Sequence, residues 1–165
     1  MILYINGYKG QNSKKAIIFE KEFDAEHIII DYDDMNSIKN GIKKIEEILK
    51  NKTPFIIASS TGAIVSQIFN VPQVLLNPLV EVEDLRALGC QNIAFLKELE
   101  MKEVFSKKMI ILSRNDELLD YTKAKSKYEH KEFQNIIIKG DKHSITNIKE
   151  LLGDLELYFN INNNC

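Results

Sequence analysis

Short apolar runs recur along the chain, separated by polar loops and by longer segments with apolar residues at helical spacing. The runs lie at residues 2–5, 27–30, 55–58, 74–76, 109–112 and 135–138. A strand covered on both faces is apolar throughout, whereas a half-exposed strand alternates with polar residues. The pattern therefore predicts six buried strands of a parallel sheet.

The segments between the runs predict helices, because their apolar residues fall three or four positions apart. The expected helices cover about 13–23, 36–49, 63–69, 83–88, 92–100, 121–130 and 145–158. Asn12 or Ser13 is expected to cap the first helix and Asn36 the second. The Asn-rich tail at 160–165 is expected to fray.

Alternation of strands and helices indicates an α/β fold with three layers, in which helices cover both faces of a mainly parallel sheet. At 165 residues the chain fits a single domain, 1–165. The rhythm breaks only at about 79–108, where two short helices predict a small cap insertion.

Composition narrows the function classes. The net charge is -2, with basic residues scattered among acids, which gives no support for a nucleic-acid partner. Cys90 and Cys165 lie far apart and suggest free thiols in a reducing cytoplasm. The N-terminal apolar run is too short for a signal peptide, and no run approaches the ~20 residues of a membrane span, so we expect no membrane partner.

The third strand leads into Ala58-Ser59-Ser60-Thr61-Gly62 and then into a helix. A strand that turns into a helix at a serine flanked by small residues is typical of a nucleophile elbow, whose strained turn exposes the hydroxyl. The strict pattern has glycine where this chain has Ala58. The alternative is an ordinary loop that caps the following helix.

Further polar residues follow other strands. Asp116 comes after the fifth strand and His143 after the sixth, so serine, acid and histidine appear in the chain order of the hydrolase triad. The carboxyl ends of parallel strands share one edge, where sites gather. Asp120 is a rival acid, but its position suits a helix cap. His27 and His130 fit a strand start and a charged helix face.

These segments resemble the α/β-hydrolase superfamily, and specifically the small bacterial YqiA/YcfP-like esterases. The matching segments are Ile2-Leu-Tyr-Ile-Asn-Gly-Tyr8, Ala58-Ser-Ser-Thr-Gly62, Leu76-Asn-Pro-Leu-Val80, Asn115-Asp-Glu-Leu-Leu-Asp-Tyr121 and Gly140-Asp-Lys-His-Ser144. The resemblance implies Ser60 as nucleophile, Asp116 as acid and His143 as base. It also implies the strand order 2-1-3-4-5-6. Asn6 stands where the family pattern has histidine.

The resemblance implies a serine carboxylesterase or thioesterase that acts on a small acyl ester and needs no cofactor or metal. Backbone N–H groups of Tyr8 and Thr61 are expected to form the oxyanion hole. Asn6, Gly7, Ala58 and Gly62 are expected to support the two loops. The cap is expected to line an acyl pocket, unless its apolar residues only pack on the sheet. They are Leu79, Val80, Leu85, Leu88, Ile93, Phe95 and Leu96.

Two other classes stay open at this stage. An inactive hydrolase-fold binding protein is consistent with Asn6, Ala58 and the short cap. A phosphate-binding domain is suggested by Gly7 and Gly10, but that loop fits neither the dinucleotide nor the Walker A pattern. No His, Asp, Glu or Cys cluster has metal-ligand spacing. The sequence does not fix the oligomeric state.

Overall fold

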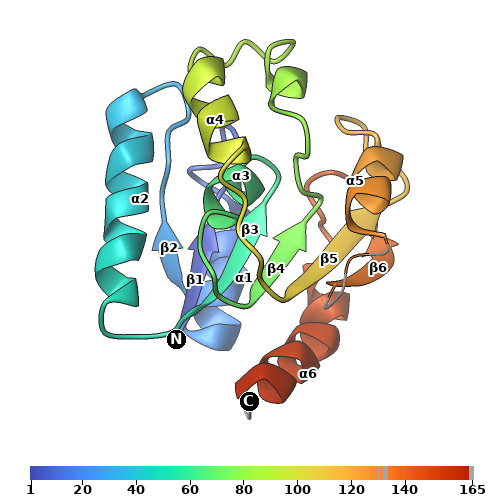
Figure 1. Cartoon of the computed structure of the whole chain (residues 1–165). Coiled ribbons are helices and arrows are strands. Elements are labelled where there is room, and N and C mark those ends of the chain that lie inside the picture. Colours follow the sequence, from blue (N-terminus) through green and yellow to red (C-terminus); the bar gives the residue numbers. More distant parts are fainter. Residues whose placement is uncertain (130, 132–133, 164–165) are drawn as a thin grey trace.

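The computed structural model describes residues 1–129, 131 and 134–163. Six strands form one sheet in which every neighbouring pair is parallel, in the order β2-β1-β3-β4-β5-β6. The strands are β1 Ile2–Ile5, β2 Glu26–Ile28, β3 Phe55–Ser59, β4 Gln73–Leu76, β5 Lys108–Ser113 and β6 Gln134–Gly140. The predicted fold class and strand order are confirmed (Figure 1).

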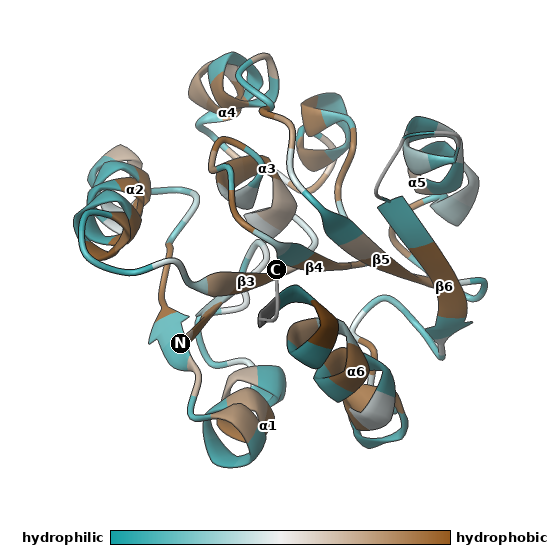
Figure 2. Cartoon of the chain, turned by 60° about the horizontal axis from the view of Figure 1, so that its bottom comes forward, coloured by the Kyte–Doolittle hydropathy of each residue, from teal (hydrophilic) through white to brown (hydrophobic). Residues whose placement is uncertain are grey.

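Helices cover both faces of the sheet. They are α1 Lys14–Phe23, α2 Met35–Leu49, α3 Gly62–Ser66, α4 Ile93–Glu100, α5 Tyr121–Tyr128 and α6 Leu152–Asn163. Short 3-10 helices lie at Val82–Leu85 and Ile148–Leu151. Figure 2 shows α1 and α6 on one face and α2, α3, α4 and α5 on the other.

The sheet separates two hydrophobic cores. Along β1, Leu3 and Ile5 join the core under α2 to α5, whereas Ile2 and Tyr4 join the core under α1 and α6. Successive strand residues point to opposite faces, so a strand that is apolar throughout contributes to both cores. This is why the apolar runs predicted the architecture.

The second strand ends earlier than predicted. It spans Glu26–Ile28 instead of 27–30, because the backbone of Ile30 bonds to a side chain and not to a strand. The N–H of Ile30 donates to Asn6 Oδ1, and its carbonyl accepts from Asn6 Nδ2, both at 2.8 Å. The predicted cap of α2 was also wrong: Asp34 caps this helix by accepting from the N–H of Asn36.

The helix after β3 is shorter than predicted, since α3 ends at Ser66 and not near residue 69. The Gln73 side chain donates to the carbonyls of Ser66 and Phe69 at 2.9 Å each. These bonds satisfy backbone carbonyls that a longer helix would use. Ser13, as expected, caps α1 by accepting from the N–H of Lys15.

The cap residues pack on the sheet, and none of them lines the cavity that borders Ser60. Leu79, Leu85, Ile93 and Leu96 are buried in the core under α2 to α5. Val80 and Phe95 pack against that core, and Leu88 is exposed. The predicted helix at 83–88 is only the 3-10 helix Val82–Leu85. The packing alternative is therefore confirmed.

The C-terminal segments differ from the prediction in extent. Ile145 lies in a loop with a positive φ of 44°, and helical structure begins at Ile148. Helix α6 continues to Asn163, so the tail at 160–163 is helical and not frayed. Cys90 is a buried free thiol. His130 and Cys165 lie outside the described residues.

Candidate active site

Ser60 occupies a strained turn directly after β3. Its φ is 49°, in the left-handed region that costs a non-glycine residue about 1 kcal/mol or more. Its N–H donates to the carbonyl of Leu76, and its own carbonyl accepts from Ala63 and Leu79. These backbone bonds hold the turn between α3 and the end of β4. The elbow geometry predicted for this serine is present.

Two glycines allow the neighbouring loop to lie against this turn. A Cβ on Gly7 would lie 3.0 Å from the Cβ of Ser60 and 3.1 Å from the carbonyl oxygen of Ser59. A Cβ on Gly62 would lie 2.8 Å from the carbonyl oxygens of Ile5 and Asn6. Larger side chains would therefore separate the elbow from the loop after β1. Ala58 is fully buried in β3, beside Ile5 of β1.

Asn6 fixes that loop through its side chain. Besides its two bonds to Ile30, Asn6 Nδ2 donates to the carbonyl of Gly7 at 2.9 Å. The Tyr32 hydroxyl donates to the carbonyl of Asn6 at 2.7 Å. Asn6 is fully buried. The asparagine thus joins the end of β1 to the segment after β2.

The backbone N–H groups of Tyr8 and Thr61 lie on the two loops that meet at Ser60. Neither N–H donates a hydrogen bond within the part of the chain that the structure describes. The Tyr8 hydroxyl donates to Asp33 at 3.0 Å, which holds this residue over the loop. Thr61 is fully buried, at the start of α3. Tyr8 is partly exposed and Thr61 is not, so of the two only Tyr8 has surface that solvent reaches.

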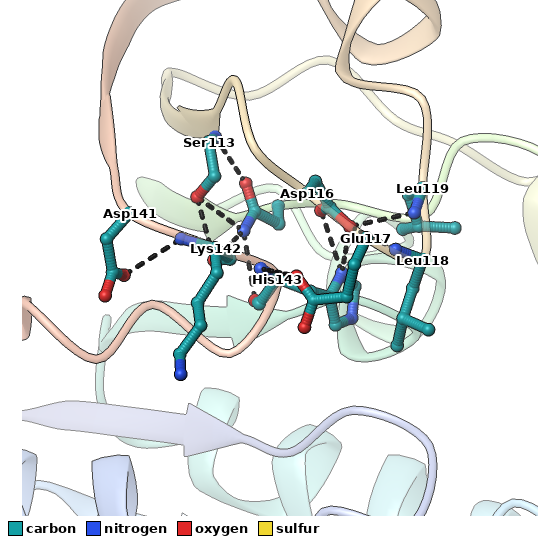
Figure 3. A network of polar contacts seen from close by, with 9 residues as sticks. Ser113, Asp116, Glu117, Leu118, Leu119, Asp141, Lys142 and His143 are labelled. Atoms are coloured by element: carbon teal, nitrogen blue, oxygen red, sulfur yellow. Dashed lines mark hydrogen bonds and ion pairs between the residues drawn. The ribbon is translucent and has the colours of Figure 1, made fainter.

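His143 and Asp116 form a close pair. The ring nitrogen Nδ1 of His143 lies 2.8 Å from Asp116 Oδ2 and 3.0 Å from Oδ1 (Figure 3). Only 15% of the His143 side chain and 2% of the Asp116 side chain are exposed. Since a carboxylate accepts, Nδ1 carries the proton and Nε2 is left as the basic nitrogen.

Asp116 is kept ionised by its surroundings. Burial alone would raise the pKa of its carboxyl, but hydrogen bonds from His143 and from the N–H groups of Leu119 and Leu118 outweigh burial and lower the pKa. Asp120, the rival acid, caps α5 by accepting from the N–H of Thr122 at 2.9 Å. Asp116 is therefore the carboxylate that contacts His143.

The loop that carries His143 is anchored by Asn77, which follows β4. Asn77 Nδ2 lies 3.0 Å from the carbonyls of Lys142 and His143 and 2.9 Å from Ser113 Oγ. Asn77 Oδ1 accepts from the N–H of Ser113 at 2.8 Å. The N–H of His143 donates to Glu117 at 3.1 Å. The sequence shows Asn77 at a strand end but not this role, because its partners lie far along the chain.

Ser60 and His143 border the same cavity, of about 450 Å³. Gly7 and Tyr8 also line it, together with residues from the start of α1 and from the loop after His143. No hydrogen bond joins Ser60 to His143 within the described ranges. Asp116 reaches the cavity only through His143, because it is not itself among the lining residues. The three predicted site residues thus converge on one region.

Two other features, a metal cluster and a membrane-spanning helix, are not found in the part of the chain that the structure describes. Within 1–129 and 134–163, no group of three or more His, Cys, Asp or Glu side chains could hold a metal ion. No helix of that part has the length and apolar character needed to span a bilayer.

Solved structures with the same arrangement include several hydrolases. Est1E from Butyrivibrio proteoclasticus has a TM-score of 0.69 and 11% identity, over 97% of this chain and 86% of that chain. An alpha/beta superfamily hydrolase from Oenococcus oeni PSU-1 has a TM-score of 0.65 and 14% identity, over 99% and 92%. The ydeN gene product from B. subtilis has a TM-score of 0.66 and 12% identity, over 96% and 98%.

The chain has the α/β-hydrolase fold. The resemblance to that superfamily, predicted from the motifs, is confirmed. Proteins with the α/β-hydrolase fold catalyse many different reactions, so structural similarity at 11–14% sequence identity shows the fold alone. The sequence also matches the Uncharacterised protein family (UPF0227) over residues 82–159, which include Asp116 and His143 but not Ser60. No curated protein matches the sequence.

Proposed function

We propose that this protein is a serine hydrolase that cleaves small carboxylic esters or thioesters. One observation carries the proposal: a strained serine borders the same cavity as a histidine whose other ring nitrogen is bound to a largely buried carboxylate. Strain at a turn is retained where the surrounding structure enforces it, which is common at reactive residues. The α/β-hydrolase fold supports the same reading.

In the proposed reaction, the Ser60 hydroxyl attacks the ester carbonyl and His143 Nε2 takes its proton. The C–O or C–S bond breaks, the leaving group receives that proton, and an acyl-serine remains. Water then attacks the acyl-serine, with His143 again accepting and returning a proton. Asp116 holds the imidazole in the required tautomer and stabilises its charged form.

The N–H groups of Tyr8 and Thr61 are proposed to bind the oxygen that becomes negatively charged. They lie on the two loops that meet at Ser60, and neither is used by another acceptor within the described residues. Loss of one such donor costs about 3 kcal/mol of transition-state stabilisation. The glycines that let these loops approach, Gly7 and Gly62, therefore serve the proposed site as spacers.

The test is active-site labelling with a fluorophosphonate, followed by hydrolysis of para-nitrophenyl acetate. Wild type is expected to be labelled on Ser60 and to hydrolyse the ester, and Ser60→Ala is expected to lose both. Ser59→Ala is the matched control, because its hydroxyl precedes the elbow, and it is expected to keep the label. Equal inertness of wild type and Ser60→Ala in both assays would leave a binding protein with a hydrolase fold.

A further inference from the structure

The cavity beside Ser60 has an unusual balance of charge. Lys9, Lys14 and Lys15 line it, and no Asp or Glu of the described residues does so. The chain as a whole has a net charge of -2, so a cavity lined by three lysines and no acidic residue is more positive than the protein as a whole. A cavity lined by one sign of charge concentrates ligands of the opposite sign.

These three lysines have no carboxylate partner within the described ranges. Lys123, by comparison, is paired with Glu81 and Asp84. Lys9 Nζ lies 5.0 Å over the Tyr8 ring, a contact that leaves its charge unneutralised. A bound anion would therefore find lysines that are not already in ion pairs.

Lys15 is the most enclosed of the three. It is partly buried, whereas Lys9 and Lys14 are exposed. The charges of Asp116 and Asp141 act on it, but neither forms an ion pair with it. Asp116 is bound to His143, and Asp141 accepts from Thr146. The first turn of α1, which carries Lys15, contains no acidic residue.

Part of the remaining lining is apolar, next to serine, threonine and asparagine residues that also border the cavity. Ile18 of α1, Ile145 of the loop after β6 and Ile148 at the start of a 3-10 helix border the same cavity, together with Tyr4. A ligand that matches both parts combines a short carbon skeleton with a negative group. An ester with only hydrocarbon groups would form no ion pair with the lysines. An ester with only polar groups would make no apolar contact with the isoleucines.

We infer that the substrate of the proposed hydrolase is a small anionic ester, one that carries a carboxylate or a phosphate group held by Lys15, Lys14 and Lys9. This inference rests on the proposed function, because it names the class of ester that the Ser60 site accepts. The negative group lies at the α1 side of the cavity, and the ester carbonyl lies at Ser60.

Two matched pairs of esters test the charge preference. The mono-para-nitrophenyl ester of adipic acid is compared with para-nitrophenyl hexanoate, which has the same carbon chain without the charge. On the alcohol side, 4-acetoxybenzoate is compared with its methyl ester. We expect at least one anionic ester to exceed its neutral partner about tenfold in kcat/KM, equivalent to about 1.4 kcal/mol. Added salt should reduce this ratio.

Lysine variants locate the negative group. Lys15→Met is expected to reduce the anionic-to-neutral ratio about tenfold, and the exposed Lys14→Met provides a second variant that cannot disturb the core. Lys21→Met is the control, since Lys21 lies in the last turn of α1 and does not line the cavity. Inhibition by adipate compared with inorganic phosphate then distinguishes a carboxylate group from a phosphate group.

The outcomes separate this inference from the proposed function. Ser60-dependent hydrolysis with equal or higher kcat/KM for both neutral esters would overturn the anionic substrate and leave the serine hydrolase. If no ester is cleaved, Ser60→Ala is titrated with monomethyl adipate and with methyl hexanoate, followed by NMR. Tighter binding of the adipate would uphold an anion site in a protein without esterase activity, and equal or absent binding would overturn it.

Discussion

Replacement of Asn77 by alanine tests how the His143 loop is held. The Asn77 side chain accepts from the Ser113 N–H and has three acceptors for its two amide protons. It can therefore make three hydrogen bonds at once, each worth about 1 kcal/mol net. Its backbone has a φ of 42°, where alanine costs about 1 kcal/mol. We expect Asn77→Ala to lower the free energy of unfolding by about 4 kcal/mol.

Urea denaturation followed by circular dichroism measures this loss, and calorimetry should show a melting temperature lower by roughly 10 °C. Activity adds a second readout. Asn77 holds the carbonyls of Lys142 and His143 but does not line the cavity. A shift of the imidazole by about 1 Å can cost about 100-fold in rate, so kcat should fall with little change in KM.

Asn92→Ala is the control for this experiment. Asn92 Nδ2 makes one bond, to the carbonyl of Tyr32 at 2.9 Å, in a partly buried setting. Its removal should cost about 1 kcal/mol and leave kcat unchanged. If Asn77→Ala were no more destabilising than Asn92→Ala, the bonds of Asn77 would not be what holds the loop, and the reasoning would be wrong.

Three further outcomes follow from the structure. Gly62→Ala should lower the free energy of unfolding by about 2 kcal/mol, because the added Cβ would meet backbone oxygens at 2.8 Å. Gly153 lies in open space at the start of α6, so Gly153→Ala should raise the free energy of unfolding by about 0.5 kcal/mol. Urea denaturation of both variants checks this. Burial lowers the pKa of Lys15 to about 8 against the charges of Asp116 and Asp141, so NMR of reductively methylated protein should show the Lys15 signal titrating near 8, and a value near 10.5 would contradict it. Asp116→Asn should lower kcat about 1,000-fold or more by favouring the wrong imidazole tautomer. Folding lowers the pKa of Asp116, so the stability that this carboxylate contributes is complete above the unfolded pKa of about 3.9 and is lost as the pH falls through the folded pKa. Wild type should therefore lose its excess stability over Asp116→Asn below about pH 4. Thermal melts of both proteins between pH 3 and 7 test this.

The sequence predicted the strands because burial on both faces leaves a direct mark in composition. Boundaries were missed where a distant side chain competes for the backbone. Asn6 takes both polar groups of Ile30, 24 positions away, and so ends β2 early. Asp34, and not Asn36, caps α2. Aspartate and asparagine cap helices equally well, so the sequence does not show which of the two residues begins the helix.

In the proposed site, too, some features could be predicted from the sequence and others could not. Ser60, Asp116 and His143 could be named because each follows a strand, and the fold brings strand ends together. The prediction that cap residues line an acyl pocket was wrong, because apolar residues in a cap can equally pack into the core. Here they bury the sheet face under α4. Lys15 gave no local signal, since nothing in its own sequence neighbourhood places it beside the Ser60 elbow.

The packing of segment 79–108 onto the sheet has a consequence for how this protein can change over time. The cavity takes its walls mainly from the loop after β1, the start of α1 and the segment after β6, while the stretch 79–108 packs into the core on the other face of the sheet. Substitutions within 79–108 that improve the packing of that core therefore leave the residues that border the cavity unchanged. A lineage could gain thermal stability through this segment without altering the walls of the cavity.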